Sequence, residues 1–302
     1  MATYKETVGT AVVNYAGDYP GAVDGELWYD STNKDFKYQY PNVTAAGSWR
    51  TANNLNTARE ALAGAGTQTA GLAFGGYTGS VSADTEKYDG TSWTEVNNLN
   101  TARTYVAGTG TQTSALAFGG FLDPGNTAVT ESYNGTNWTE VADLNVARNA
   151  IGGAGADNTS ALAIGGSGAL TNTETWNGSS WTEVNNLNSG RSAMGAAGII
   201  TSAICAGGNP DTVNVETWNG TNWTEVANLN TSRSGLAASG VDNTANLAFG
   251  GTRPSNSNLQ TNEIWNNSSW TELADMSTGR NYLSGVGTTT ASLAFGGTVS
   301  TP

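Results

Sequence analysis

The apolar positions of this chain fall in short runs that are bounded by glycine and by polar turn residues. Residues 115–118 form a continuous apolar run that ends in a Gly-Gly pair, and two short segments, 130–133 and 138–141, follow it and carry one aromatic residue each. Runs of four to eight residues with such boundaries are typical of β-strands. No segment repeats its apolar residues with the period of an amphipathic helix. The pattern therefore predicts an all-β fold.

This pattern recurs six times along the chain. Each copy has a tryptophan, an arginine ten residues later, and a Gly-Gly pair sixteen or seventeen residues after the arginine. The tryptophans are Trp49, Trp93, Trp138, Trp181, Trp223 and Trp270, and the arginines are Arg59, Arg103, Arg148, Arg191, Arg233 and Arg280. Each full unit reads as four short strands, with Asp-Gly or Asn-Gly in four of the five turns between the third and fourth strands. Units of this kind, 42 to 47 residues apart, predict a β-propeller.

Each full unit also has an aromatic residue five positions before its tryptophan. These residues are Tyr88, Tyr133, Trp176, Trp218 and Trp265. A buried aromatic side chain removes about 150–250 Å² from water, so we expect these rings to hold neighbouring blades together. The alternative is that they form an exposed platform for sugars.

The two ends of the chain are each incomplete as repeats. Five blades, which begin at the first five repeat arginines, have all four strands, but the copy that begins at Arg280 has only two before the chain ends. Residues 36–40 and 47–49 are predicted to form the two outer strands of a blade without the two inner strands. Because unpaired edges would otherwise remain, we expect six blades, the sixth closed by N-terminal and C-terminal strands. We expect residues 36–302 to form this propeller and residues 1–35 to form an N-terminal arm or hairpin, which either pads the sixth blade or attaches the protein to a larger assembly.

The combined motif resembles kelch repeats. A Gly-Gly pair after an apolar strand, then Glu-x-aromatic, Trp and Arg match the kelch pattern over roughly residues 36–297, without the usual proline before the arginine. Residues 25–32 (Gly-Glu-Leu-Trp-Tyr-Asp-Ser-Thr) and 36–38 (Phe-Lys-Tyr) resemble a short hairpin of tailed-bacteriophage virion proteins, particularly marine ones. The resemblance implies a kelch-like propeller carried by a virion or tail-fibre protein.

Composition excludes several kinds of chemistry. The 302 residues include no histidine and one cysteine, and the net charge is −13. Histidine-based triads, histidine zinc sites, disulfides within the chain and cysteine metal clusters are therefore excluded, and we expect neither a metal nor a cofactor. The acidic balance argues against a nucleic-acid partner. No apolar run is long enough for membrane insertion, and Cys205, which stands where other units have alanine, is expected to be buried.

The candidate ligand-binding residues lie on one face. The chain between each Gly-Gly pair and the next glutamate varies in length, and variable loops on a rigid scaffold often carry recognition; the alternative is drift in unselected loops. The candidates are the six repeat arginines around the channel mouth, with Phe121, Asp123, Asn209, Asp211 and Arg253 in the loops. The arginines either pair with the recurring glutamates (Glu86, Glu131, Glu174, Glu216, Glu263) or bind a carboxylate, sulfate or phosphate. In some kelch domains the matching arginines bind acidic peptides, so the resemblance implies the second possibility.

The function expected from these features is non-enzymatic. We expect a phage virion structural protein (a tail, fibre or decoration component), made in the host cytoplasm and exposed on the surface of the particle, that presents the propeller for adhesion to a host glycan or protein. Its partners would be other virion proteins, contacted through the N-terminal arm, and a host-surface glycan or an acidic ligand. The alternatives are an intracellular kelch-type interaction scaffold and a glycan hydrolase. A hydrolase needs two carboxylates that face a cleft, whereas these glutamates recur in every blade, which indicates an architectural role.

Overall fold

The computed structural model describes residues 4–5, 11–15, 27–38, 48–253 and 258–299. The chain divides into two units, Met1–Ser48 and Trp49–Pro302. The division therefore lies further along the chain than the boundary after residue 35 that the repeat pattern suggested.

The N-terminal unit contains one four-stranded sheet. Its strands are β1 (Tyr4–Lys5), β2 (Ala11–Tyr15), β3 (Leu27–Asp30) and β4 (Asp35–Tyr38), in that spatial order. The central pair β2–β3 is parallel, and the other two pairs are antiparallel. The turn between β3 and β4 is fixed by Asp30, whose Oδ1 accepts the N–H groups of Thr32 and Asn33, as an aspartate that begins a turn commonly does.

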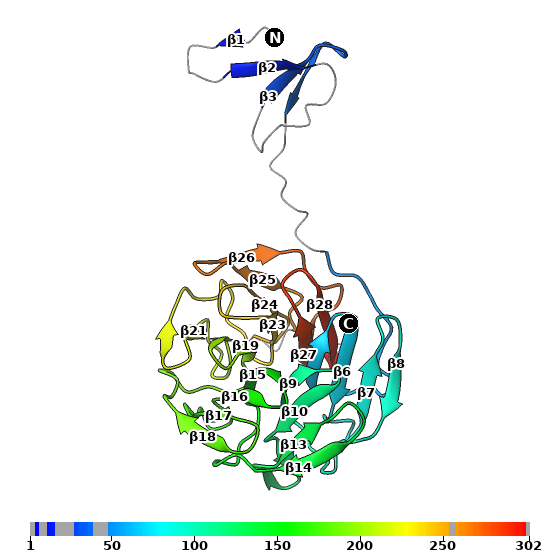
Figure 1. The fold of residues 1–302 in the computed structure, drawn as a ribbon, viewed down its shortest axis with the longest axis vertical. Helices are drawn as coiled ribbons and strands as arrows, with labels where there is room; N and C mark the ends of the chain where they lie inside the picture. Colours follow the sequence, from blue (N-terminus) through cyan, green and yellow to red (C-terminus); the bar gives the residue numbers. More distant parts are fainter. Residues whose placement is uncertain (1–3, 6–10, 16–26, 39–47, 254–257, 300–302) are drawn as a thin grey trace. The chain divides into compact units, whose positions relative to one another are not determined.

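The second unit contains five antiparallel four-stranded sheets, each built from four strands of one repeat (Figure 1). The first sheet holds β5 (Ala63–Thr67), β6 (Ala70–Phe74), β7 (Thr85–Tyr88) and β8 (Trp93–Val96). The second holds β9 (Ala107–Thr111), β10 (Ser114–Phe118), β13 (Thr130–Tyr133) and β14 (Trp138–Val141). The third holds β15 (Gly152–Asp157), β16 (Ser160–Ile164), β17 (Thr173–Trp176) and β18 (Trp181–Val184).

The remaining strands complete the ring. The fourth sheet holds β19 (Gly195–Ile199), β20 (Ser202–Ala206), β21 (Val215–Trp218) and β22 (Trp223–Glu225). The fifth holds β23 (Ala237–Gly240), β24 (Asn246–Phe249), β25 (Asn262–Trp265) and β26 (Trp270–Leu273). The sixth blade position of the ring has only β27 (Arg280–Gly287) and β28 (Ser292–Val299) among the described residues. A two-stranded ribbon, β11 (Phe121–Leu122) and β12 (Gly125–Asn126), lies in the loop after β10.

A closed cycle of backbone hydrogen bonds joins the six innermost segments. One residue per segment donates its N–H to the carbonyl of its counterpart in the neighbouring segment, with N···O distances of 2.8 to 3.0 Å. The members are Ala61, Tyr105, Ala150, Ala193, Gly235 and Tyr282, and all have φ between +50° and +62°. Because the last link runs from Ala61 to Tyr282, β27 belongs to the ring and closes it.

The expectation of six four-stranded blades is wrong in one respect. Five blades have four strands, and the sixth place is a two-stranded sheet in the part of the chain that the structure describes. Residues 36–38 lie in β4 and pair with β3 in the N-terminal unit, and residues 39–47 lie outside the described part of the chain. Trp49 does pack its ring 5.0 Å from that of Phe249, but closure of the sixth blade by N-terminal strands stays a prediction.

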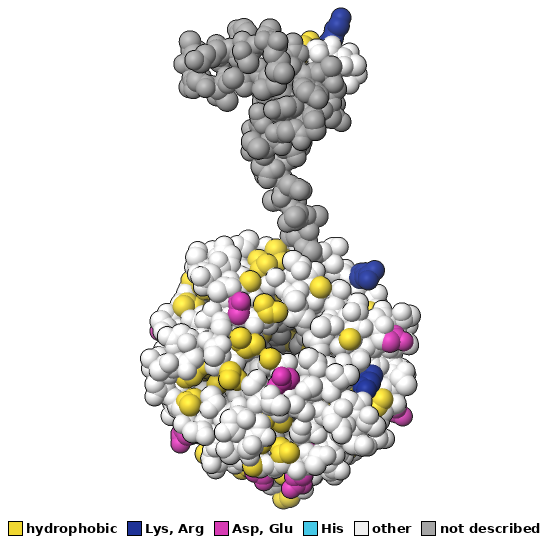
Figure 2. Space-filling view, in the orientation of Figure 1, with side chains coloured by type: hydrophobic (Ala, Val, Ile, Leu, Met, Phe, Trp, Pro, Cys, Tyr) yellow, Lys and Arg dark blue, Asp and Glu magenta, His cyan; other side chains and the backbone are white. Residues whose placement is uncertain are grey.

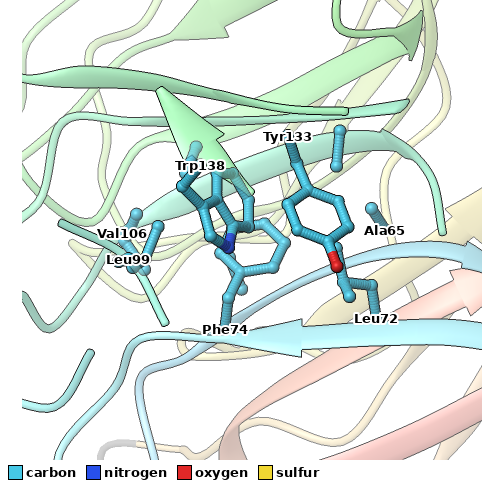
Figure 3. Packing of buried hydrophobic residues seen from close by; sticks show 10 residues of the cluster. Ala65, Leu72, Phe74, Leu99, Val106, Tyr133 and Trp138 are labelled. Carbon is cyan, nitrogen blue, oxygen red and sulfur yellow. The ribbon is translucent and has the colours of Figure 1, made fainter. Parts of the chain in front are cut away.

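Aromatic side chains fill the spaces between neighbouring blades, as the repeat pattern predicted. Between the first two blades, Trp138 packs against Phe74 at 4.9 Å and against Tyr133 at 4.8 Å (Figure 3). Phe118 and Trp181 repeat the contact between the second and third blades at 5.0 Å. Cys205 is fully buried, as expected. Among the described residues, no helix has the length and hydropathy to span a membrane.

Candidate functional site

Five of the six repeat arginines lie inside the blades. Their side chains are at most 1% exposed, and each guanidinium pairs with the glutamate of the third strand of the same blade. The pairs are Arg59–Glu86 (3.1 Å), Arg103–Glu131 (3.2 Å), Arg148–Glu174 (2.5 Å), Arg191–Glu216 (2.6 Å) and Arg233–Glu263. The internal pairing that the sequence left open is thus the one observed, and these five arginines have no exposed surface for a ligand.

Each glutamate also fixes the connection that leads into its blade. In the second blade, Oε2 of Glu131 accepts the backbone N–H of Asn100 at 2.7 Å and its side-chain amide at 2.9 Å, and Oε1 accepts the N–H of Thr101 at 3.2 Å. Burial lowers the pKa of Arg103, and the charge of Glu131 opposes that shift. The motif Leu-Asn-x-x-Arg therefore wraps a buried carboxylate, so its arginine has a structural role.

The sixth arginine differs from the other five. Arg280 is half-buried, and its Nη1 donates to the carbonyl of Gly296 at 2.9 Å. Burial lowers its pKa. No carboxylate pairs with it among the residues that the structure describes.

Three of the five loop candidates line a pocket, and two do not. Asn209, Asp211 and Arg253 border a pocket of about 450 Å³. Phe121 and Asp123 lie instead in the β11–β12 ribbon and its turn, where Phe121 exchanges two backbone hydrogen bonds with Thr104.

The pocket is lined by polar side chains and by two tyrosines. Its hydroxyl and amide residues are Asn149, Ser167, Ser192, Asn209, Ser234 and Thr252, its charged residues are Asp211 and Arg253, and the remaining lining residues are Tyr105, Ala150, Ala193 and Tyr282. Figure 2 shows one face of the protein, on which hydrophobic side chains are scattered and charged side chains are few and separate. The pocket thus offers many hydrogen-bonding groups and little net charge.

Two kinds of connection build this pocket, as the strand directions predicted. Tyr105, Asn149 and Ser192 stand one or two residues after a repeat arginine, where innermost segments begin, whereas Ser167 and Asn209 directly follow a Gly-Gly pair. The expectation that these connections share one face is confirmed by their common pocket.

The tyrosines are the two large members of the hydrogen-bonded cycle. Their neighbours in it are alanine or glycine, which leaves space at the centre. The rings of Tyr105 and Tyr282 meet edge to face at 86°, with centroids 5.3 Å apart. Neither tyrosine was predicted as a site residue, although each occupies the position two residues after a repeat arginine where the other units have Ala or Gly.

The electrostatics keep the tyrosine hydroxyls protonated. Burial raises the pKa of Tyr105 and of Tyr282, and the nearby charge of Glu60 raises both further. Burial also raises the pKa of Glu60 itself. A phenol hydroxyl both donates and accepts, so each ring presents a hydrogen-bonding group beside an aromatic surface. Within the described ranges, no group of three or more Asp, Glu or Cys side chains could hold a metal.

Comparison with known proteins identifies the architecture. No family model matches the chain, and no curated protein matches it. A solved structure, that of YjhT, is similar with a TM-score of 0.68 over 82% of this chain and 93% of that chain, at 13% sequence identity. The second unit is a β-propeller. At this identity the likeness shows the fold alone, so the kelch resemblance of the repeats and the phage resemblance of residues 25–38 stay predictions.

Proposed function

We propose that this chain is a non-enzymatic structural component of a phage virion, in the tail, in a fibre or as a decoration, and that its propeller binds a host-surface glycan in the channel-mouth pocket. The observation that supports a glycan ligand is that the rings of Tyr105 and Tyr282 contact each other in a pocket lined by hydroxyl and amide groups. Ligand sites typically combine apolar or aromatic walls with a few placed polar groups, and a saccharide presents both C–H surface and hydroxyls.

The size and charge of the pocket agree with this ligand class. A volume of about 450 Å³ lies within the range of about 300–1,000 Å³ that small-molecule sites occupy. Arg253 brings one positive charge, while Asp211 and the nearby Glu60 bring two negative ones. This balance favours a neutral saccharide over the acidic ligand that a ring of free arginines would have bound.

The N-terminal unit supplies the proposed attachment. It has a sheet of its own, β1 to β4, apart from the repeats, and its residues 25–38 carry the resemblance to virion hairpins. We propose that this unit contacts other virion proteins and that the propeller is exposed on the outside of the particle. The kelch-type scaffold remains an alternative that rests on the resemblance alone.

One observation favours a second candidate, a glycan hydrolase. Glu60 and Asp211 both lie near Tyr282, and burial raises the pKa of Glu60, as it does for a general acid. Incubation of the protein with the glycans that it binds distinguishes the two functions: a binding protein leaves them intact, whereas a hydrolase releases sugars and loses that activity in Glu60→Gln.

The binding function is tested with a glycan array and pocket variants. We expect the full chain to bind a subset of neutral glycans, and Tyr282→Ala to weaken that binding at least tenfold, since a ring contact and a hydrogen bond are lost together. Val241→Ala serves as the control, because Val241 is 58% exposed beyond the end of β23. Binding that survives both Tyr105→Ala and Tyr282→Ala contradicts the pocket assignment.

A further inference from the structure

The sixth sheet has an open outer edge in the part of the chain that the structure describes. β28 pairs only with β27 among the described residues, whereas the second strand of each other blade pairs with a third strand. Backbone groups on such an edge are a ready template for another strand.

The other five blades show which strand belongs at this edge. In each of them a third-strand glutamate lies opposite the same position of the second strand, as Glu131 lies opposite Ala117 and Glu174 opposite Ala163. The equivalent position in β28 is Ala294, which precedes Phe-Gly-Gly just as Ala117 does. An aromatic residue follows two positions after each glutamate.

Arg280 differs from the other repeat arginines at the position where a third strand would bring a carboxylate. Its five counterparts are buried and paired with a carboxylate, while Arg280 is half-buried and has no ion pair within the described ranges. Ala294 is likewise half-buried, whereas Ala117 and Ala163 are fully buried. A cation half removed from water gains from a charged partner, so the edge is complementary to an acidic strand.

The connection that leads into β27 also lacks a residue that the other units use to hold the glutamate. The other units have Leu-Asn-x-x-Arg, whose asparagine holds the glutamate, but this unit has Met276-Ser277-Thr278-Gly279-Arg280. The sixth unit thus lacks both the glutamate and the side chain that would fix it, and an incoming carboxylate would have Arg280 as its main partner.

The N-terminal residues proposed to close the sixth blade do not supply a carboxylate. Residues 36–48 contain no Asp or Glu. Residues 36–38 are already paired with β3 in the N-terminal unit. The acidic group therefore has to come from outside residues 36–48.

We propose that the outer edge of β28 binds an extended strand of a partner protein, antiparallel to β28, with a glutamate opposite Ala294 and an aromatic residue two positions later. The main-chain hydrogen bonds would extend the sheet, as in β-strand addition, and the glutamate would pair with Arg280. This inference is independent of glycan binding, because it concerns a different surface.

The chain itself supplies the probe. An acetylated and amidated peptide with the sequence of residues 128–134 (Ala-Val-Thr-Glu-Ser-Tyr-Asn) reproduces the third strand of the second blade. We expect it to bind the full-length protein saturably in isothermal titration calorimetry. The same peptide with Glu131→Gln should bind at least tenfold more weakly, because a hydrogen bond to a charged group contributes more than a neutral one.

Two controls separate strand addition from other binding. A peptide of the same composition in scrambled order, and one with alternate amides N-methylated, should not bind. In the variant Arg280→Met, the unaltered peptide and its Glu131→Gln form should bind equally weakly, provided that the variant melts in one transition. The comparison of the two peptides on the unaltered protein does not depend on how any variant folds.

Two outcomes overturn the proposal. If the unaltered protein shows no saturable binding up to millimolar peptide, the edge is not a docking site, and closure by the chain's own residues is then favoured. If the peptides with Glu and Gln bind the unaltered protein equally, the pairing with Arg280 is wrong.

Discussion

At the scale of single residues, the recurring arginine and glutamate determine how one blade is joined to the next. Their pairing could be foreseen, because each of the five full units has one arginine and, at the same position of its third strand, one glutamate. The asparagine that binds the same carboxylate through its backbone and side chain, as Asn100 binds Glu131, was not foreseen, because its role depends on a turn geometry that composition does not reveal. Tyr105 and Tyr282 were missed for a similar reason, since non-glycine residues with positive φ are rare.

Glu131→Gln should be strongly destabilising. The change leaves the guanidinium of Arg103, which is fully buried, without its paired carboxylate, and breaking a buried pair from one side typically costs about 3–5 kcal/mol. Urea unfolding followed by circular dichroism measures this loss.

Glu140→Gln is the matched control for that experiment. Glu140 lies directly opposite Glu131 in the β13–β14 pair but is exposed, so its replacement should change the free energy of unfolding by less than about 0.5 kcal/mol. Equal effects of the two substitutions contradict the structural role of the buried pair.

At the scale of strands, the four-strand unit was predictable from its periodicity, and the small residues of the first strand from crowding near the axis. Gly108 of β9 illustrates the crowding, because a Cβ there would collide with Cζ of Phe74 in the preceding blade. The β11–β12 ribbon and the parallel pairing of β2 with β3 could not be predicted, because both depend on contacts that have no periodic signature.

Gly108→Ala should destabilise the protein by about 1–3 kcal/mol, the usual range for an added methyl group in a well-packed interior. The thermal midpoint of unfolding measures the effect. Gly125→Ala is the control, since a Cβ at Gly125 meets nothing within 4 Å. A Gly108→Ala protein as stable as the control would show that neighbouring blades are less tightly packed than the structure indicates.

At the scale of the whole molecule, the repeat count predicted six places around an axis, and the hydrogen-bonded cycle has six members. The two strands after Arg280 were foreseen, but the pairing of residues 36–38 with β3 rather than with the sixth sheet was not. A strand pattern in the sequence does not identify the partner strand. The sharing of one face by the two kinds of connection that line the pocket could be predicted, because it needs only strand direction, but the pocket itself was not predicted.

Removal of residues 280–302 should abolish cooperative unfolding of the propeller. The truncation deletes β27 and β28 together with Tyr282, so it breaks two of the six links of the cycle and uncovers Trp93, whose ring packs 5.0 Å from Phe295. Thermal melting followed by circular dichroism should change from one sharp transition to a broad one. Removal of residues 300–302 alone, which lie beyond β28, is the control, and an unchanged melt of the larger truncation refutes the importance of closure.

The cycle of amide links also determines where the molecule can begin to come apart. An open array of repeats has terminal members that fray first, but every innermost segment here has a neighbour on both sides. Because no segment is an end, new termini made in an exposed turn between a third and a fourth strand, with the ends of the propeller joined by a flexible linker, should leave the same cycle intact. Circular permutants cut at different blades should then melt at similar temperatures.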